Sequence, residues 1–529
     1  MSAASPSSLA PLKGPVFRML WLAWLAANVT MWMNDVAAAW LMTSLTDSAV
    51  MVALVQAAST LPVFVLGLPS GALADIVDRR RYFAVTQLWV ASVAVVLCAC
   101  SVAGVLTAPL LLALTFANGV GMAMRWPVFA AIVPEVVPRP ELPAALALNG
   151  VAMNMSRVIG PVVAGALLAG AGSAFVFALN AVLSIGAFVL ILRWKSQRKA
   201  SALPGERFLG AMRVGLQHVV QSPRMRNVLI RIFLFFLQST SLTALLPLVA
   251  RGIHGGGAGT FTLLLAAMGC GAVVTALYLP RLRQDISRDQ FVRWGTSVHA
   301  LAAITVVFSP TLWLAVPAMA VAGMAWIATA NSLTLAAQMA LPNWVRARGM
   351  SIYQMALMGG SAAGAALWGQ VAGWTSVSAS IVAAALVGPA VLLLTRRLSV
   401  DGGEDEDLSP AKPGSAAPVP LVEPLPDDGP VMVTVEYLID PSRADAFMEI
   451  MEQTRRARLR QGALSWGLFR DPASPGRYLE YFLDETWVEH LRRLERFTAA
   501  DVGLRERRLA FHLGAEPPKV QRFLGESID

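Results

Sequence analysis

Charged residues are scarce in this chain. They make up 14% of the 529 residues, whereas a soluble domain carries about 25%. Hydrophobic residues reach 56%, and the mean hydropathy is +0.59. An ordinary soluble core cannot hide this much apolar surface, so the composition predicts an integral membrane protein.

Cysteine is scarce, and several catalytic signatures are missing. The three cysteines, Cys98, Cys100 and Cys270, lie within apolar runs, which excludes a disulfide framework or a cysteine-based zinc site. No G-x-x-x-x-G-K-[ST], G-x-S-x-G or H-E-x-x-H sequence occurs, so ATP is excluded as a direct driver. We expect no cofactor and no metal site, and no enzyme in the apolar part.

Long apolar runs fill most of the chain. A transmembrane helix needs about 20 mostly apolar residues, and residues 1–16 are only a short polar tail. Because the first run is too long for a signal peptide, we predict a retained first span. The twelve predicted spans are 17–45, 49–74, 82–107, 109–133, 144–170, 173–194, 226–251, 259–280, 291–309, 311–338, 348–372 and 374–395.

The connections between these spans alternate in charge. Every second connection is basic, whereas the others carry at most Arg251. Basic loops remain in the cytoplasm, so we expect both termini there, and the short basic clusters do not indicate nucleic acid binding despite the net charge of +9. The basic connections contain Arg79–Arg81, Arg139, Arg193–Arg226, Arg281–Arg288, Arg346–Arg348 and Arg396–Arg397.

An internal repeat divides the spans into two groups of six. Gly160 and Gly165 recur 204 residues later as Gly364 and Gly369, and a Gly-Met-Ala sequence at position 121 recurs at position 323. Parallel repeats of this kind characterise several transporter folds. We therefore predict six-helix halves at 17–194 and 226–397, joined by a cytoplasmic central loop at 195–225.

The last 130 or so residues have a different character. Residues 398–430 are rich in Pro, Gly, Asp and Glu and predict a flexible linker. Residues 431–529 then follow a βαββαβ order, which predicts a cytoplasmic α+β domain of the ferredoxin-like type. Its predicted elements are strand 431–439, helix 443–461, strands 463–469 and 477–483, helix 487–508 and strand 520–524.

The connection after the second span carries a recognisable motif. The sequence from Gly71 to Arg81 resembles the major facilitator signature G-x-L-x-D-R-x-G-R-[KR], with Ile76 and Asp78 as departures. The resemblance implies a twelve-helix major facilitator fold and a cytoplasmic latch that opens and closes during alternating access. The latch residues that it implies here are Gly71, Asp75, Asp78, Arg79, Arg80, Glu135 and Arg139. Independently of the resemblance, we expect Gly71 to let two helices approach closely.

A second motif lies in the fifth span. Residues Gly160, Pro161 and Gly165 resemble the core of the antiporter motif G-x-x-x-G-P-x-x-G-G, although Ser156 and Ala164 replace two of its glycines. A Gly/Pro interruption allows close packing and bending of the helix. In the family this motif accompanies export, whereas the alternative here is ordinary small-residue packing.

The pattern over residues 14–397 resembles the enterobactin-exporter-like branch of this superfamily. The local features that carry this resemblance are Trp40, Pro127 and the segment Pro134–Arg139. The branch implies a multi-pass protein of the bacterial cytoplasmic membrane. The tail resembles antibiotic-biosynthesis-monooxygenase domains in element order and length, which implies homodimer formation and, as an alternative, an oxygenase that uses Trp466, His490 or His512.

Asp35, Arg125 and Arg157 lie well inside the first, fourth and fifth predicted spans. Such residues are costly in lipid and should face a cavity or one another. Our hypothesis is that Asp35 carries the coupling proton and that an arginine pairs with it in one access state. Alternatively the arginines bind an anionic substrate such as a carboxylate or catecholate, or the charges form a permanent ion pair that fixes helix packing.

Neutral polar and large apolar side chains add further candidates for the transport path. Each one alone is better explained by helix packing, although together they predict an adaptable wall. The polar candidates are Asn28, Asn34, Asn118, Asn154, Gln238, Asn331 and Gln354, and the apolar ones are Trp32, Trp126, Trp326, Met33 and Met122.

These observations predict a secondary transporter that exports a small molecule, such as a siderophore, drug or metabolite, in exchange for protons. Its expected partners are that substrate, protons, the lipid bilayer and a second copy of the tail domain. Two alternatives remain open at this stage: an importer of the same fold, and a membrane-tethered monooxygenase or sensor that acts through its tail.

Overall fold

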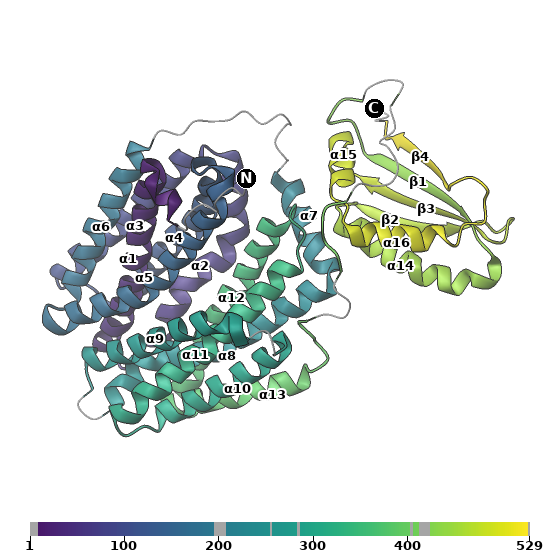
Figure 1. The fold of residues 1–529 in the computed structure, drawn as a ribbon. Helices are drawn as coiled ribbons and strands as arrows, with labels where there is room; N and C mark the ends of the chain where they lie inside the picture. Colours follow the sequence, from purple (N-terminus) through teal and green to yellow (C-terminus); the bar gives the residue numbers. More distant parts are fainter. Residues whose placement is uncertain are drawn as a thin grey trace, which may run out of the picture. The chain divides into compact units, whose positions relative to one another are not determined.

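The computed structural model describes residues 9–194, 208–253, 256–282, 286–401, 406–411, 420 and 424–526. The chain forms two compact units (Figure 1). The helical unit comprises Met1–Gly205, Leu229–Leu335 and Ser351–Val400. The C-terminal unit comprises Glu206–Val228, Ala336–Met350 and Asp401–Asp529, so it includes two segments from the middle of the chain as well as the tail.

A helix occurs at each of the twelve predicted spans. In the described chain, ten helices are long and apolar enough to cross a membrane. Helices α10 and α12, at the ninth and eleventh predicted spans, are less apolar. Helix α10 carries three charged residues in its first two turns, and α12 contains six glycines as well as Ser and Gln residues. The bounds are α1 Pro15–Leu45, α2 Ala49–Ile76, α3 Arg79–Val102, α4 Ala108–Val136, α5 Leu142–Gly170, α6 Ser173–Arg193, α8 Pro223–Gly252, α9 Ala258–Leu282, α10 Arg288–Val307, α11 Leu312–Met339, α12 Arg346–Trp374 and α13 Val377–Leu394.

The central connection contains one more helix, α7 (Phe208–Gln221). The sequence predicted only a polar loop over 195–225, and residues 195–207 lie outside the described chain. Apolar residues recur along one side of α7, and Val214 and Val219 are buried there. A helix with a single apolar face packs against protein instead of crossing lipid.

The repeated glycines occupy equivalent positions in the two halves. A side chain at Gly160 of α5 would overlap Trp32 of α1, and one at Gly165 would overlap Thr262 of α9. In α12, a side chain at Gly364 would overlap the Leu237 carbonyl of α8, and Gly369 faces α2. Exchanging the two halves converts the first pair of contacts into the second. The sequence repeat therefore reflects one close crossing within each half and one between the halves.

A methyl group at Gly364 is therefore expected to be destabilising. Gly364→Ala pushes α12 away from the backbone of α8, which cannot yield as a side chain would. We expect a loss of about 1–3 kcal/mol, measured as a lower melting temperature of the purified protein in detergent. Gly186→Ala in α6 is the control, because the added methyl meets no neighbouring helix of the described chain within 4 Å. Equal melting temperatures of the two variants would contradict the packing argument.

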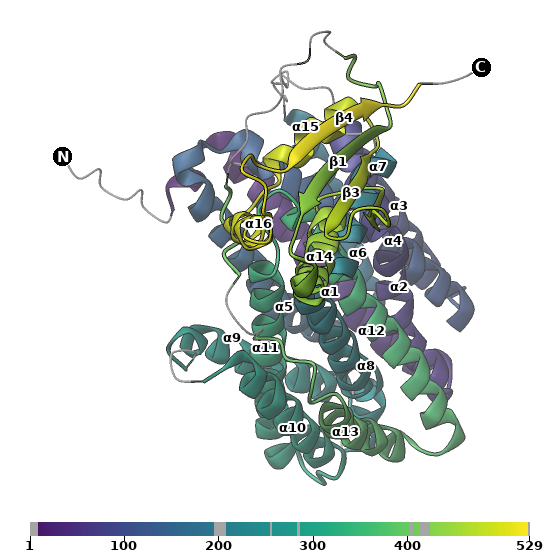
Figure 2. The ribbon, with the colours of Figure 1, turned by 90° about the vertical axis from the view of Figure 1, so that its right-hand side faces the viewer.

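The tail folds as a four-stranded antiparallel sheet of order β2-β3-β1-β4. The strands are β1 Val431–Leu438, β2 Ser465–Arg470, β3 Arg477–Asp484 and β4 Lys519–Leu524, and the helices are α14 Ala444–Arg460, α15 Trp487–Glu495 and α16 Ala499–Leu509. Strands β3, β1 and β4 lie side by side in Figure 2. Tyr437, Phe447, Met451 and Phe511 form the core between this sheet and its helices.

One predicted element of the tail is wrong. The sequence predicted a continuous helix over 487–508, but the chain forms two helices with a break at Arg496–Thr498. Thr498 caps α16 through a capping box with Asp501, and Phe497 is buried. A capping box supplies partners for the free N–H groups of a new helix start. The cap therefore replaces the backbone hydrogen bonds that a continuous helix would have made at the break.

Candidate functional site

Arg125 is completely buried in α4 and is bound by protein groups. Its guanidinium donates to the Ala27 carbonyl at 3.2 Å and to Gln87 Oε1 at 3.5 Å, and it lies 5.6 Å from the Trp24 ring centroid. Met122, one of the predicted wall residues, also contacts it. These partners belong to α1, α3 and α4, so Arg125 ties together helices of the N-terminal half.

Further polar groups extend from Arg125 through the same half. Gln87 donates to the Ser184 carbonyl at 3.1 Å, and the Ser184 hydroxyl donates to Asn180 Oδ1 at 3.1 Å. The Asn180 amide in turn donates to Asn34 Oδ1 at 3.4 Å. Sequence reasoning missed Gln87, Asn180 and Ser184. A lone amide within an apolar run, the signal that identified Asn34, also marks Gln87 and Asn180.

Asp35 follows Asn34 on α1 and is partly buried. Among the residues that the structure describes, no ion pair joins Asp35 to Arg125 or Arg157. The permanent ion pair considered from the sequence is therefore not formed in this conformation. Asp35 is also the only acidic residue within the twelve predicted spans.

Arg157 lies where the two halves meet. Its guanidinium carbon is 5.4 Å from the ring centroid of Trp32 in α1 and 4.7 Å from that of Trp326 in α11. Both tryptophans were predicted wall residues, one from each half. Phe236 of α8 packs edge-on against Trp326 at 5.4 Å. This cluster of Arg157, Trp32, Trp326 and Phe236 is called the Arg157 cluster below.

The predicted latch is described only in part. The side chains of Asp75, Glu135 and Arg139 lie outside the described residues. Asp78 caps α3 by accepting from the Arg81 amide at 2.9 Å, which explains why an aspartate stands where the motif has glycine. Arg80 donates to the Leu192 carbonyl at 2.6 Å. Leu192 lies at the C-terminal end of α6, where the helix dipole favours a cation.

The glycine of the same motif is less crowded than predicted. A side chain at Gly71 would meet Pro127 and Ser351 only at 3.9 Å, which is ordinary van der Waals contact. The close helix approach inferred for Gly71 is therefore absent in this conformation, whereas Gly160 and Gly165 do carry such an approach.

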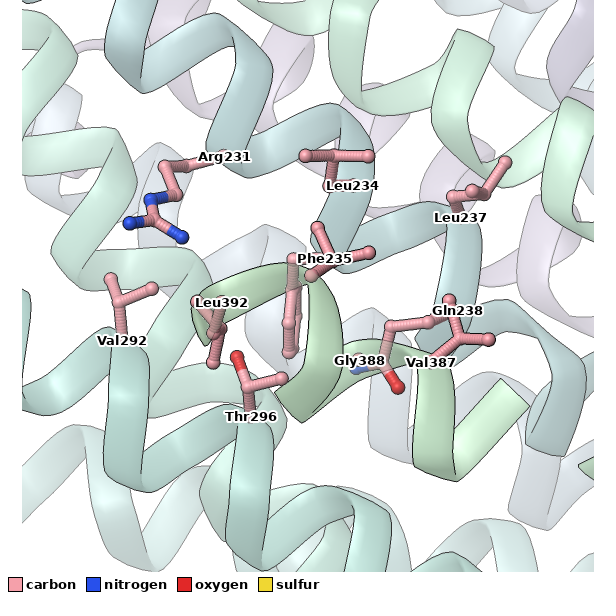
Figure 3. Close-up of a pocket in the computed structure, with 11 residues that line it drawn as sticks. Arg231, Leu234, Phe235, Leu237, Gln238, Val292, Thr296, Val387, Gly388 and Leu392 are labelled. Carbon is pink, nitrogen blue, oxygen red and sulfur yellow. The ribbon is translucent and has the colours of Figure 1, made fainter. Parts of the chain in front are cut away.

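A small cavity lies between α8, α10 and α13 (Figure 3). Its volume is about 20 Å³, which is room for one ordered water. Arg231, at one end, donates to Thr395 Oγ1 at 2.7 Å and to the Thr395 carbonyl at 2.8 Å. The sequence did not single out Arg231, and its bonds identify it as a cap on the end of α13 instead of a substrate residue.

Two buried carboxylates organise the C-terminal unit. Glu480 accepts from Tyr437 Oη at 2.8 Å, Arg458 Nε at 3.1 Å and Trp466 Nε1 at 3.1 Å. Asp484 accepts from Arg493 Nε at 2.9 Å and contacts His490 Nδ1 at 2.7 Å. The Phe482 ring separates the two groups, with Arg458 at 4.4 Å and Arg493 at 4.3 Å from its centroid.

The three predicted oxygenase candidates do not converge on one site. Trp466 belongs to the Glu480 group and His490 to the Asp484 group, while His512 Nδ1 accepts from the Leu438 amide at 3.1 Å. Burial lowers the pKa of His490, and so does Arg493, against the opposing effect of Asp484. Each side chain thus has a structural partner of its own.

The transmembrane secretion effector model matches residues 6–528, nearly the whole chain and including the tail. The chain belongs to this family, within the major facilitator superfamily. This family member is 23% identical over 282 residues to the staphyloferrin A transporter of Staphylococcus aureus (strain NCTC 8325 / PS 47), which covers 52% of this chain and 70% of the relative.

Solved transporters share the fold of this family member. A bacterial homologue of the human lysosomal transporter Spinster, inward-facing and unoccupied, superposes with a TM-score of 0.57 at 14% identity over 72% of this chain and 96% of that one. The nucleoside transporter NupG gives 0.56 at 13% identity, covering 73% and 99%. At these identities the likeness establishes the transporter fold alone.

Proposed function

We propose that this chain is a proton-coupled exporter of a small molecule in the bacterial cytoplasmic membrane. In this proposal twelve helices span the membrane, both termini are cytoplasmic, and the two halves rock about a central path. The Arg157 cluster carries the proposal, because it holds an ionisable side chain between aromatic rings of both halves. A group in this position responds directly to any change in how the halves meet.

Asp35 is the proposed proton-carrying group. It is the only acid within the predicted spans, and it has no ion-pair partner among the described residues. A carboxylate in lipid is expensive and therefore protonates readily when water is excluded. The proposed cargo is a siderophore, drug or related metabolite, and the similarity to a staphyloferrin A transporter favours the first of these.

Transport by membrane vesicles tests the direction and the coupling. Inverted vesicles that contain the protein are given an acidic interior and a panel of radiolabelled siderophores and drugs. If the protein is an exporter, the labelled substrate accumulates inside these vesicles, and the accumulation is lost when the pH gradient is removed. Accumulation only in right-side-out vesicles would instead identify an importer of the same fold.

The C-terminal unit is proposed to regulate transport. Within this unit the tail packs on α7, where Arg213 pairs with Glu485 at 2.6 Å. The C-terminal unit also includes Trp344, from the segment Ala336–Met350. The Trp344 ring lies 5.4 Å from the His218 ring of α7 and 5.1 Å from the Arg496 guanidinium of the tail. The segments that carry these contacts continue directly into α8, α11 and α12, so the tail binds the connections that alternating access must move.

Loss of the Trp344 side chain tests this regulatory role. Trp344→Ala removes a cation–π contact with Arg496, which is worth about 0.5–2 kcal/mol. We expect faster amide exchange in α7 and α14 and a transport rate that rises about threefold. Trp313→Ala is the control, because Trp313 is 92% exposed, and an unchanged rate in Trp344→Ala would contradict regulation through this contact.

The tail is also proposed to pair with a second copy of itself. The face of the sheet away from the helices carries exposed Phe469, Leu479 and Phe523, and Phe469 stacks on Tyr481 at 5.6 Å. This resembles the ferredoxin-like domains of the monooxygenase type, and pairing would cover the exposed apolar face. A single-chain mass for the purified protein by light scattering would contradict the dimer.

A further inference from the structure

The Arg157 cluster contains hydrogen-bond donors without acceptors. Arg157 Nε and Trp32 Nε1 are buried and make no hydrogen bond. Within the part of the chain that the structure describes, no carboxylate or carbonyl oxygen accepts from Arg157. Because a buried donor left unpaired costs free energy, this cluster is incomplete without an acceptor.

Arg125 and Arg231 are buried in the helical unit and have more acceptors than Arg157. Arg125 donates to a carbonyl and to an amide oxygen, and Arg231 donates to the end of α13. All three nitrogens of Arg231 and both terminal nitrogens of Arg125 thus have acceptors in the protein, although Arg125 Nε has none. Arg157 instead relies on Trp32 and Trp326, and a cation–π contact supplies charge stabilisation but no acceptor lone pair.

We propose that Arg157 binds a carboxylate group of the transported compound, beside a flat apolar portion that rests on the aromatic rings. The planar guanidinium matches a carboxylate through two parallel hydrogen bonds. Trp32, Trp326 and Phe236 provide the apolar surroundings, in which such a bond is stronger than in water. This inference rests on the proposed transport function, because it names the substrate class of that path.

The packing of α5 supports this assignment. Gly160 lies one turn from Arg157 and allows the backbone of α1 at Trp32 to approach α5. Gly269 of α9 contacts Val158 of the same turn. These glycines thus bring α1 of one half and α9 of the other half close to the turn of α5 that carries Arg157. This close packing places the Arg157 guanidinium where the two halves meet.

Binding to the purified full-length chain in lipid nanodiscs tests the proposal. The probes are 1-naphthoate and 1-naphthamide, which have the same shape and differ in charge at neutral pH. Isothermal titration calorimetry is expected to show naphthoate binding about tenfold more tightly than the amide, or about 1.4 kcal/mol. Arg157→Gln is expected to remove this preference, and Arg157→Lys to retain part of it because the charge remains.

Arg251→Gln is the matched control. Arg251 also stacks on a tryptophan, Trp40, at 5.1 Å, but it is exposed and donates to Ser44 Oγ at 3.1 Å. We expect this variant to keep the full preference for naphthoate. Equal affinity of the wild type for both probes, absence of naphthoate binding, or a preference that survives in Arg157→Gln would each overturn the assignment.

Two outcomes separate this inference from the proposed export. Should vesicles fail to export while naphthoate selectivity depends on Arg157, the anion site stands and the export does not. Should export proceed while Arg157→Gln leaves selectivity intact, the site is wrong and the export stands. Thermal melting of Arg157→Gln, compared with Arg157→Lys, confirms that each variant is folded before binding is interpreted.

Discussion

Replacing Asp35 with asparagine is expected to abolish transport driven by a pH gradient. Asparagine preserves the size and polarity of the side chain but cannot carry a proton between the two sides. Because no other acid lies within the predicted spans, no neighbouring carboxylate replaces it. Gradient-driven accumulation in inverted vesicles should therefore fall to the level of vesicles without the protein.

Exchange of labelled for unlabelled substrate without a gradient distinguishes a loss of proton coupling in Asp35→Asn from a damaged transport path. Such exchange needs the path but no net proton movement, so Asp35→Asn should retain it. Asp47→Asn is the matched control, because Asp47 is exposed just beyond α1, and it should transport like the wild type. Normal gradient-driven transport by Asp35→Asn at equal protein levels would remove Asp35 from the coupling mechanism.

Replacing Glu480 with glutamine is expected to destabilise the C-terminal unit by about 3–5 kcal/mol. Burial alone would raise the pKa of Glu480, but Arg458 and Arg508 outweigh it and lower this pKa from 4.5 to about 2. The folded unit therefore favours the charged carboxylate. Glutamine would leave Arg458 buried without a counter-charge, and amide exchange of β3 in the full-length chain should accelerate accordingly.

The pH dependence of this effect has a definite sign. Because the pKa of Glu480 is lower in the folded than in the unfolded chain, its contribution is complete above about pH 4.5 and declines as the pH falls toward 2. The difference between wild type and Glu480→Gln should shrink over this interval. Glu436→Gln is the control, since Glu436 pairs at the surface with Arg477, which is 48% exposed, and surface pairs contribute about 0–1 kcal/mol.

The positions of the helices could be predicted because each depends on a local property. Apolar runs of sufficient length form helices in lipid, since every backbone N–H and C=O must be paired within the segment. The strand and helix order of the tail was predicted for a similar reason, because alternating and helical periodicities occur in consecutive stretches. The break at Thr498 was missed, since the apolar pattern continues across it and only the capping box with Asp501 ends the first helix.

The roles of the intramembrane charges could not be predicted from local pattern. Arg125 and Arg157 look alike in the sequence, each a single arginine within an apolar run. Their partners come from helices distant in the chain: Gln87 for Arg125, and Trp326 for Arg157. The interaction of the tail with α7 and Trp344 is likewise a contact between segments more than a hundred residues apart.

The sequence by itself determined that the chain is a helical membrane protein with two repeated halves and a separate α+β tail. Composition, loop charge and repeat spacing can be read from the linear sequence without knowing any tertiary contact. Only the tertiary structure decided that Arg125 donates to protein oxygens, whereas Arg157 has no acceptor among the described residues. Hydrogen bonding depends on packed neighbours. The neighbours of Arg125 come from other helices of its own half, whereas the rings around Arg157 come from both halves.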